Sequence, residues 1–288
     1  MQQRTTSGEL RRLRLEALGR RLFDRVTRPL PSALSELIMF ALKEGWACLF
    51  GGAMVALMIL TRLLWPEDAA LGRYDVLFLS ALLLQCLFLA LKLETWREAL
   101  VILIFHLVGT LMELFKTSAG SWTYPEDAFF RIGGVPLFSG FLYASVGSYM
   151  ARVMRVLHLR FTNYPPLWMT IVLGALIYAN FFTHHFVPDM RIALFAAAAL
   201  LWGRCWVSFT VDREPRRMPL LLGFALIAFF IYLAENIGTL TATWIYPDQI
   251  DGWRPVTLGK YGSWFLLMLV SFVLVTLVHR PAGPKAPE

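Results

Sequence analysis

Two acidic residues in apolar sequence are each followed by the same aromatic pattern. Glu113 precedes Trp122-Thr123-Tyr124-Pro125-Glu126, and Glu235 precedes Trp244-Ile245-Tyr246-Pro247-Asp248, at the same spacing. An ionised, unpaired carboxylate is costly inside a membrane, so we expect both glutamates to face the interior of a helix bundle. A buried carboxyl group can donate a proton to a bound substrate. We therefore predict Glu113 and Glu235 as a catalytic acid and base.

Other polar and aromatic residues cluster after the same apolar segments. Their aromatic rings can bind an apolar molecule or stabilise a cation through their π faces. The predicted substrate-binding residues are Trp122, Tyr124, Glu126, Asp127, His184, His185, Asp189, Asn236, Trp244, Tyr246 and Asp248. A simpler interpretation is that Trp and Tyr mark the membrane interface, with Glu113 paired to Lys116 and Asp127 to Arg131 one helical turn later.

The adjacent histidines His184 and His185 have a separate interpretation. At a helix end or in a loop, both can bind one metal ion together with Asp189. A hydrogen-bonded pair at the interface, or a substrate contact, is the favoured interpretation, and we predict no metal site. The residues that match them in the first half of the chain, Arg62 and Leu63, are not histidines, so any such site is asymmetric.

Composition predicts the elements that must position these residues. With 57% hydrophobic and 16% charged residues, a 288-residue chain cannot bury its apolar surface in a soluble core. Segments of about 17 to 20 apolar residues are long enough to cross a bilayer. We predict an all-α polytopic membrane bundle with eight spans, at 46–65, 75–91, 99–115, 134–153, 167–182, 192–209, 220–238 and 261–279.

The sequence also matches itself at an offset of 122 residues. Besides the two glutamate motifs, this offset pairs Trp46 with Trp168 and Gly52 with Gly174. Eight spans then form two parallel four-helix repeats, at 32–153 and 154–279, related by an axis along the membrane normal. Basic residues concentrate in alternate loops, which places both termini in the cytoplasm of a bacterium and the chain in its inner membrane.

The ends of the chain have their own composition. Residues 1–31 carry many of the basic residues that give the net charge of +7, interleaved with leucines at helical spacing. This pattern predicts an amphipathic helix on the anionic bilayer surface, or alternatively a helix that binds a protein partner, and not a nucleic-acid site. Residues 280–288 are rich in proline and predict a disordered tail. Oligomeric state stays open.

The segment from Gly120 to Gly140, together with Asn180 to Arg191, resembles an uncharacterised bacterial integral membrane family, domain of unknown function 817. The likeness covers most of the chain beyond the N-terminal helix. It implies a membrane fold and no known activity.

A more distant likeness concerns carotenoid-pathway membrane proteins, the heterodimeric-type lycopene cyclases and carotenoid hydratases. In them a membrane carboxylate precedes Trp-x-Tyr and then Gly-x-Pro, as Glu113, Trp122, Tyr124, Gly134 and Pro136 do here. The cyclases carry two glutamates after that proline, where this chain has Leu-Phe-Ser. The resemblance implies a related fold and an isoprenoid ligand.

Three functions are compatible with these patterns. The first is an enzyme that cyclises or hydrates an isoprenoid or other lipid by acid–base chemistry, without a cofactor. The second is a proton-coupled transporter, since parallel repeats with carboxylates inside the membrane also occur in transporters. The third is a subunit that binds a lipid or pigment without catalysis. The partners expected in each case are the lipid bilayer and a hydrophobic small molecule.

Overall fold

The computed structural model describes residues 31–66, 68–212 and 214–283. Residues 1–30 of the predicted amphipathic helix and 284–288 of the predicted tail lie outside the described residues. The chain divides into two compact units, Met1–Leu42 and Lys43–Glu288. The second unit contains both glutamate motifs and the helices that carry them.

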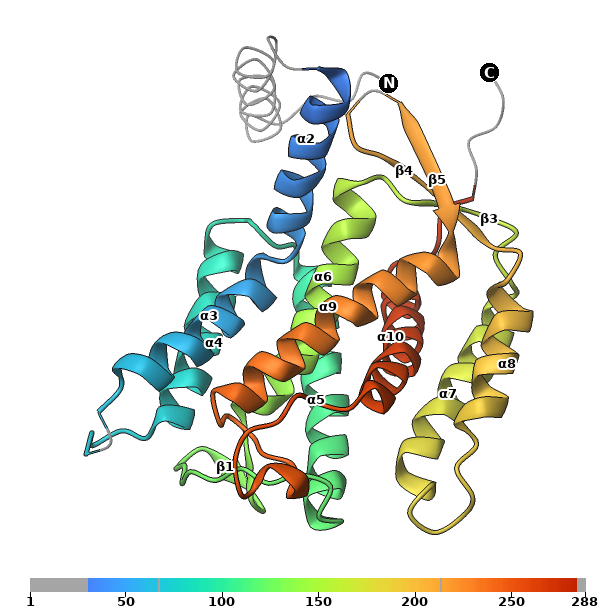
Figure 1. Cartoon of the computed structure of the whole chain (residues 1–288). Coiled ribbons are helices and arrows are strands. Elements are labelled where there is room, and N and C mark those ends of the chain that lie inside the picture. Colours follow the sequence, from blue (N-terminus) through green and yellow to red (C-terminus); the bar gives the residue numbers. More distant parts are fainter. Residues whose placement is uncertain (1–30, 67, 213, 284–288) are drawn as a thin grey trace. The chain divides into compact units, whose positions relative to one another are not determined.

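Helices form most of the described chain (Figure 1). Their bounds are α2 Ser32–Ala47, α3 Leu49–Leu64, α4 Arg73–Ala90, α5 Trp96–Ser118, α6 Phe138–Val156, α7 Leu167–Thr183, α8 Arg191–Trp202, α9 Leu220–Leu240 and α10 Leu258–Val278, with a short 3₁₀ turn η1 at Pro247–Gln249.

Local sequence explains where several of these helices begin. Thr95 caps α5, because its hydroxyl accepts the Glu98 N–H while the Glu98 carboxylate accepts the Thr95 N–H. Pro166 and Pro219 directly precede α7 and α9, where a missing backbone N–H costs nothing. Both arrangements satisfy or avoid the free N–H groups of a first helical turn.

Four of the described helices are long and apolar enough to cross a membrane: α4, α5, α9 and α10. A fifth span results if α2 and α3 together form one broken span, and α7 and α8 are shorter apolar helices. The 12 residues of α8 extend only about 18 Å, less than a ~30 Å hydrocarbon core. The predicted count of eight spans is therefore not confirmed.

The predicted sixth span, 192–209, is wrong in its second half. After α8 the chain enters strand β4 (Trp206–Thr210), which pairs antiparallel with β3 (Arg160–Thr162) and β5 (Pro215–Pro219). Gly203 ends the helix, and Val207 lies between Phe161 and Met218 in the sheet. The apolar, aromatic and β-branched residues from 202 to 210 suit a strand as well as a helix.

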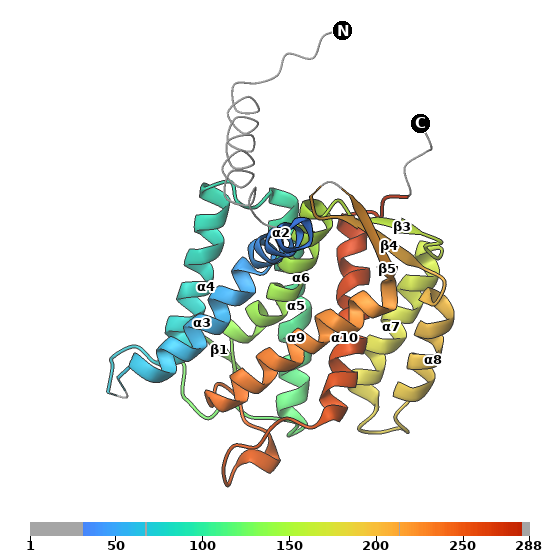
Figure 2. The same cartoon turned by 45° about the horizontal axis from the view of Figure 1, so that its top comes forward.

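Polar loops gather at two opposite ends of the Lys43–Glu288 unit. The segments that follow α5 and α9 lie at one end, and the β3–β4–β5 sheet lies at the other, in both views (Figures 1 and 2). A second hairpin, β1 (Arg131–Ile132) with β2 (Val135–Pro136), belongs to the segment after α5. The two glutamate motifs are thus brought to the same end of the bundle.

Arg152 is a charged residue inside the helix bundle. It lies within α6, fully buried, and its guanidinium pairs with Glu94 at 2.6 Å and donates to the Trp46 carbonyl. Removing one partner of such a pair would leave an uncompensated buried charge. The pair joins α6 to the turn between α4 and α5.

Candidate functional site

Glu113 lies in the last third of α5 and is 3% exposed. Its carboxylate accepts three side-chain hydrogen bonds: from the Trp122 indole N–H at 2.8 Å, the Tyr124 hydroxyl at 2.6 Å and the Tyr143 hydroxyl at 2.6 Å. Hydrogen bonds to a charged acceptor are short and about twice as strong as neutral ones. The arrangement satisfies a carboxylate that has lost its contact with water.

Glu235 occupies the corresponding place in α9 and is 5% exposed. The Trp244 indole N–H donates to it at 3.2 Å, and the Tyr246 hydroxyl donates to the same oxygen. Trp264 of α10 provides a further side-chain interaction with Glu235. Each glutamate therefore holds the Trp and the Tyr that follow it by nine and eleven residues.

The two motifs meet directly. Thr123 and Ile245 form an antiparallel β-bridge in which each backbone N–H donates to the other carbonyl at 3.0 Å. The Trp122 and Tyr246 rings lie 6.0 Å apart between centroids, edge to face, and the Tyr143 and Trp264 rings lie 6.2 Å apart. In each ring pair, one ring interacts with Glu113 and the other with Glu235. We name these two glutamates and the rings that hold them the paired-glutamate site.

Lys260, in the first turn of α10, supplies the positive charge of this site. Its ammonium lies 3.9 Å from the centre of the Tyr246 ring and 5.5 Å from that of Trp122. Glu235, Asp248 and Glu113 attract it electrostatically, and Arg191 repels it. The Lys260 ammonium thus lies near the π faces of Trp122 and Tyr246, and the π face is where an aromatic ring attracts a cation. Two carboxylates and one ammonium leave one negative charge to be compensated.

The two motif tyrosines lie outside the spanning helices, and their pKa values show how strongly the site favours the phenol form. Burial, followed by the neighbouring Glu113, raises the pKa of Tyr124 well above its ordinary value. Burial, Glu235 and then Glu113 do the same for the pKa of Tyr246. Because both carboxylates act on Tyr246, the two glutamates belong to one electrostatic unit.

The histidine pair does not contact either glutamate. Lys116 donates toward the Nε2 atoms of His184 at 3.4 Å and His185 at 3.0 Å, so it does not pair with Glu113 as the simpler interpretation proposed. Burial and the charge of Lys116 lower the pKa of His185. No group of three or more metal-ligating side chains is found in the described part of the chain.

Asp189 belongs to the same loop as the histidines. Burial alone would raise its pKa, but hydrogen bonds from the Arg191 backbone, Asn180 and the Arg191 side chain outweigh this and lower it. Its carboxylate also forms an ion pair with Arg191 at 2.5 Å. Asp189 therefore fixes the turn between α7 and α8 through Asn180 and Arg191.

The remaining predicted residues hold the loops around the paired-glutamate site. Glu126 pairs with Arg73 of α4 at 2.7 Å, and that arginine also donates to the carbonyls of Thr241 and Ala242. Asp127 forms the expected pair with Arg131 at 2.8 Å, and its side chain is 97% exposed. The Asn236 carboxamide accepts the Val256 N–H, and Asp248 is exposed. Their partners are thus other than Glu113 and Glu235.

Sequence patterns did not indicate Tyr143, Lys260 or Trp264. All three come from α6 and α10, the helices that follow each motif, so no local spacing relates them to the glutamates. Lys260 carried one usable signal, because it is a charge placed next to a long apolar segment. Tyr143 and Trp264 carried none beyond being polar aromatic residues in apolar helices.

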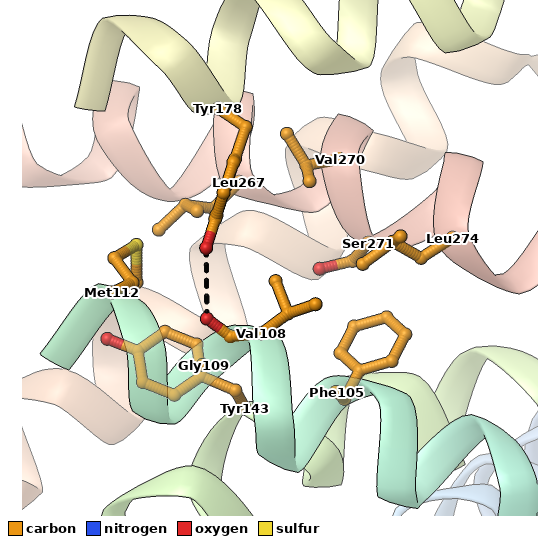
Figure 3. Close-up of a pocket in the computed structure, with 10 residues that line it drawn as sticks. All are labelled: Phe105, Val108, Gly109, Met112, Tyr143, Tyr178, Leu267, Val270, Ser271 and Leu274. Carbon is orange, nitrogen blue, oxygen red and sulfur yellow. Dashed lines mark hydrogen bonds between the residues drawn. The ribbon is translucent and has the colours of Figure 1, made fainter. Parts of the chain in front are cut away.

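A small apolar hollow lies beside Tyr143, between α5, α6, α7 and α10 (Figure 3). Phe105, Met112 and Val270 are among its lining residues, and Tyr178 crosses from α7 to donate to the Val108 carbonyl at 3.1 Å. Its volume of about 20 Å³ is near the minimum for one water molecule. A lipid chain would have to displace these side chains to enter.

Spanning helices with two buried, paired carboxylates make this chain an integral membrane protein with a polar site inside its bundle. Residues 36–272 match the family described as protein of unknown function (DUF817), and the chain belongs to this family. It is 42% identical over 248 residues to the "Uncharacterized protein YoaT" of Bacillus subtilis (strain 168), which covers 86% of this chain and 93% of that protein. The predicted family membership is confirmed.

Two solved structures resemble the fold weakly. One is a mycobacterial Insig homologue, MvINS from Mycobacterium vanbaalenii, with a TM-score of 0.47, and the other is a cross-linked MvINS trimer, with a TM-score of 0.48. Both are 17% identical to this chain, and each comparison covers 65% of this chain and 97% of the other.

Proposed function

We propose that the paired-glutamate site is a proton-sharing centre with which this membrane protein performs acid–base chemistry on an isoprenoid or other hydrophobic lipid. The observation that carries the proposal is the pairing of two buried carboxylates around one ammonium. Glu113 and Glu235 are 3% and 5% exposed, and Lys260 lies against the rings between them. One proton bound by the two carboxylates neutralises the remaining negative charge. In the low dielectric of the bundle, any other charge state of the site has a higher free energy.

The match between the two halves supports this proposal. At the 122-residue offset, α5 corresponds to α9 and α6 to α10, and the bridged residues Thr123 and Ile245 correspond to each other. An antiparallel bridge between corresponding residues is what a two-fold axis between duplicated units would produce. We infer that the site arose from two copies of one membrane unit, with each copy supplying one glutamate.

The chemistry that such a site supports is protonation of an alkene. A carboxyl O–H adds its proton to one alkene carbon, the π bond breaks, and the adjacent carbon becomes a carbocation. The second carboxylate then removes a proton from a neighbouring carbon, or water adds and releases its proton to that carboxylate. Aromatic rings of the site that Lys260 does not cover can stabilise the carbocation through their π faces. The carotenoid-pathway resemblance rests on the residue pattern alone and agrees with an isoprenoid substrate.

Lipid extraction of the purified full-length chain tests the proposal. Wild type should copurify with an enriched isoprenoid or related lipid, identified by mass spectrometry. Glu113→Gln and Glu235→Gln keep the shape of the side chain but remove proton exchange, so each variant should accumulate unconverted lipid. The double variant should be no worse than either single variant, because members of one catalytic unit are not additive.

Asp251→Asn is the matched control, because it removes an exposed acidic charge from the segment after α9, at the same end of the bundle. Its lipids should match those of wild type. Identical lipid profiles in all variants would exclude the acid–base proposal.

A proton-coupled carrier is the second candidate. It is favoured by the position of both carboxylates within helices long enough to span a membrane, where such groups often form proton pathways. Proton uptake into liposomes that contain the protein would support this candidate if it depends on an added solute and disappears in Glu113→Gln.

A further inference from the structure

Lys116 is a buried cation outside the paired-glutamate site. It lies near the end of α5, is 5% exposed, and has the imidazoles of His184 and His185 as its hydrogen-bond partners. No ion pair links it to a carboxylate within the described ranges 31–66, 68–212 and 214–283. A buried charge without a counter-charge is costly, so its place in the fold needs an explanation.

The two histidines cannot supply the missing negative charge. His184 Nδ1 lies 2.9 Å from the Asn180 carbonyl oxygen, so Nδ1 carries the hydrogen and Nε2 accepts from Lys116. The same donor reaches Nε2 of His185. Both rings are then neutral acceptors of an ammonium, and a lysine has three N–H donors, so one donor stays available.

Other charges near Lys116 add to the positive excess. Lys260 and Arg191 both repel Lys116 electrostatically, and Asp189 is the acid that attracts it. The Asp189 carboxylate is already bound by Arg191, at 2.5 Å, and by Asn180. Local charge therefore favours an anion from outside the described chain.

The surroundings indicate where that anion would come from. His184 and His185 belong to the α7–α8 loop, and apolar side chains next to them are largely uncovered: Phe186 is 79% exposed, and Ile192, at the start of α8, is 84% exposed. His185 is itself exposed, and Phe115 contacts both His185 and Phe186. Apolar side chains around a basic cluster are typical of the headgroup level of a membrane.

We propose that Lys116 and His185 bind a phosphate group, carried by a membrane lipid or free in solution, while His184 positions the Lys116 ammonium. The available Lys116 N–H donates to a phosphate oxygen, and the exposed His185 lies at the entrance. The site does not depend on the function of Glu113 and Glu235. A lipid bound here would place its headgroup at the cluster and its chains against the exposed apolar residues of the loop.

Native mass spectrometry of the full-length chain in detergent tests the proposal with three probes. The probes are phosphatidylglycerol, diacylglycerol with the same chains, and inorganic phosphate. Wild type should retain phosphatidylglycerol and not diacylglycerol. Lys116→Met keeps the length of the side chain in a buried position but removes the charge. It should lower phosphatidylglycerol retention about tenfold, as expected for the loss of one charged hydrogen bond.

Arg254→Gln is the matched control, because Arg254 is an exposed cation in the loop after α9, and it should retain the lipid as wild type does. His185→Ala changes an exposed ring and gives a second variant, with the same expected loss, if Lys116→Met does not fold. If the wild type binds inorganic phosphate but does not retain phosphatidylglycerol, the result would support a phosphate site whose ligand is soluble. Equal retention of both lipids without binding of inorganic phosphate, or no loss of binding in either variant, would overturn the proposal.

Discussion

At the residue scale, the motif tyrosines predict a loss of stability at high pH. The folded state raises the pKa of Tyr246 above the ordinary value of about 10, so it binds the phenol proton more tightly than the unfolded chain does. This contribution is complete below about pH 10 and is lost as the pH rises further. Thermal unfolding followed from about pH 8 to pH 11 should show the fall.

Tyr246→Phe should reduce that pH dependence and lower stability by about 1–3 kcal/mol at neutral pH, because Glu235 loses a donor. Tyr261→Phe is the control, since Tyr261 donates to the Ala225 carbonyl and to no carboxylate. If Tyr246→Phe unfolds with the pH profile of wild type, the hydroxyl is not held as described.

Only part of the paired-glutamate site could be predicted from the sequence. Glu113 with Trp122 and Tyr124 could be found because the motif is local: a helix end and a short turn bring residues nine and eleven positions later back to the carboxylate. Tyr143 and Lys260 could not be found this way, because they come from other helices and only tertiary packing brings them to the motif. The repeated spacing in the sequence identified the motif, and only the structure showed its partners Tyr143 and Lys260.

At the element scale, apolar length predicted most helices but not their ability to cross a membrane. The predicted segments 99–115 and 220–238 lie within α5 and α9, because long apolar runs that follow a capping Thr95 or a Pro219 strongly favour a helix. The predicted span 192–209 was wrong because a run of apolar and β-branched residues is compatible with both helix and strand. Residues 206–210 form a strand because they pair with β5 and with β3, and β3 lies far away in the sequence.

Close packing of α9 against its own motif predicts an effect of Gly238. A Cβ atom there would overlap the Trp244 ring, so Gly238→Ala must displace the indole that donates to Glu235. We expect a loss of about 1–3 kcal/mol in thermal unfolding. Gly52→Ala is the matched helical control, because nothing lies within 4 Å of its Cβ, and it should be neutral or stabilising by up to about 1 kcal/mol. Equal stability of the two variants would contradict the packing of Trp244 on Gly238.

At the scale of the whole molecule, sequence self-similarity predicted that the two motifs would lie at one end of the bundle, and the structure places them there in contact. What self-similarity could not predict is the asymmetry of the result. Lys260 corresponds to Phe138, and Tyr143 to Phe265, so each half supplies a partner that the other lacks. Topology across the membrane stays a prediction from the basic loops.

The central claim is that Glu113 and Glu235 share one proton, and infrared spectroscopy of the carboxyl C=O band tests it most directly. At neutral pH the full-length wild type should show the band of one buried protonated carboxyl group. Replacing either glutamate by Gln should abolish that band, because the remaining carboxylate then has Lys260 to itself and ionises. A band that persists in one single variant, or no band in wild type, would contradict a shared proton.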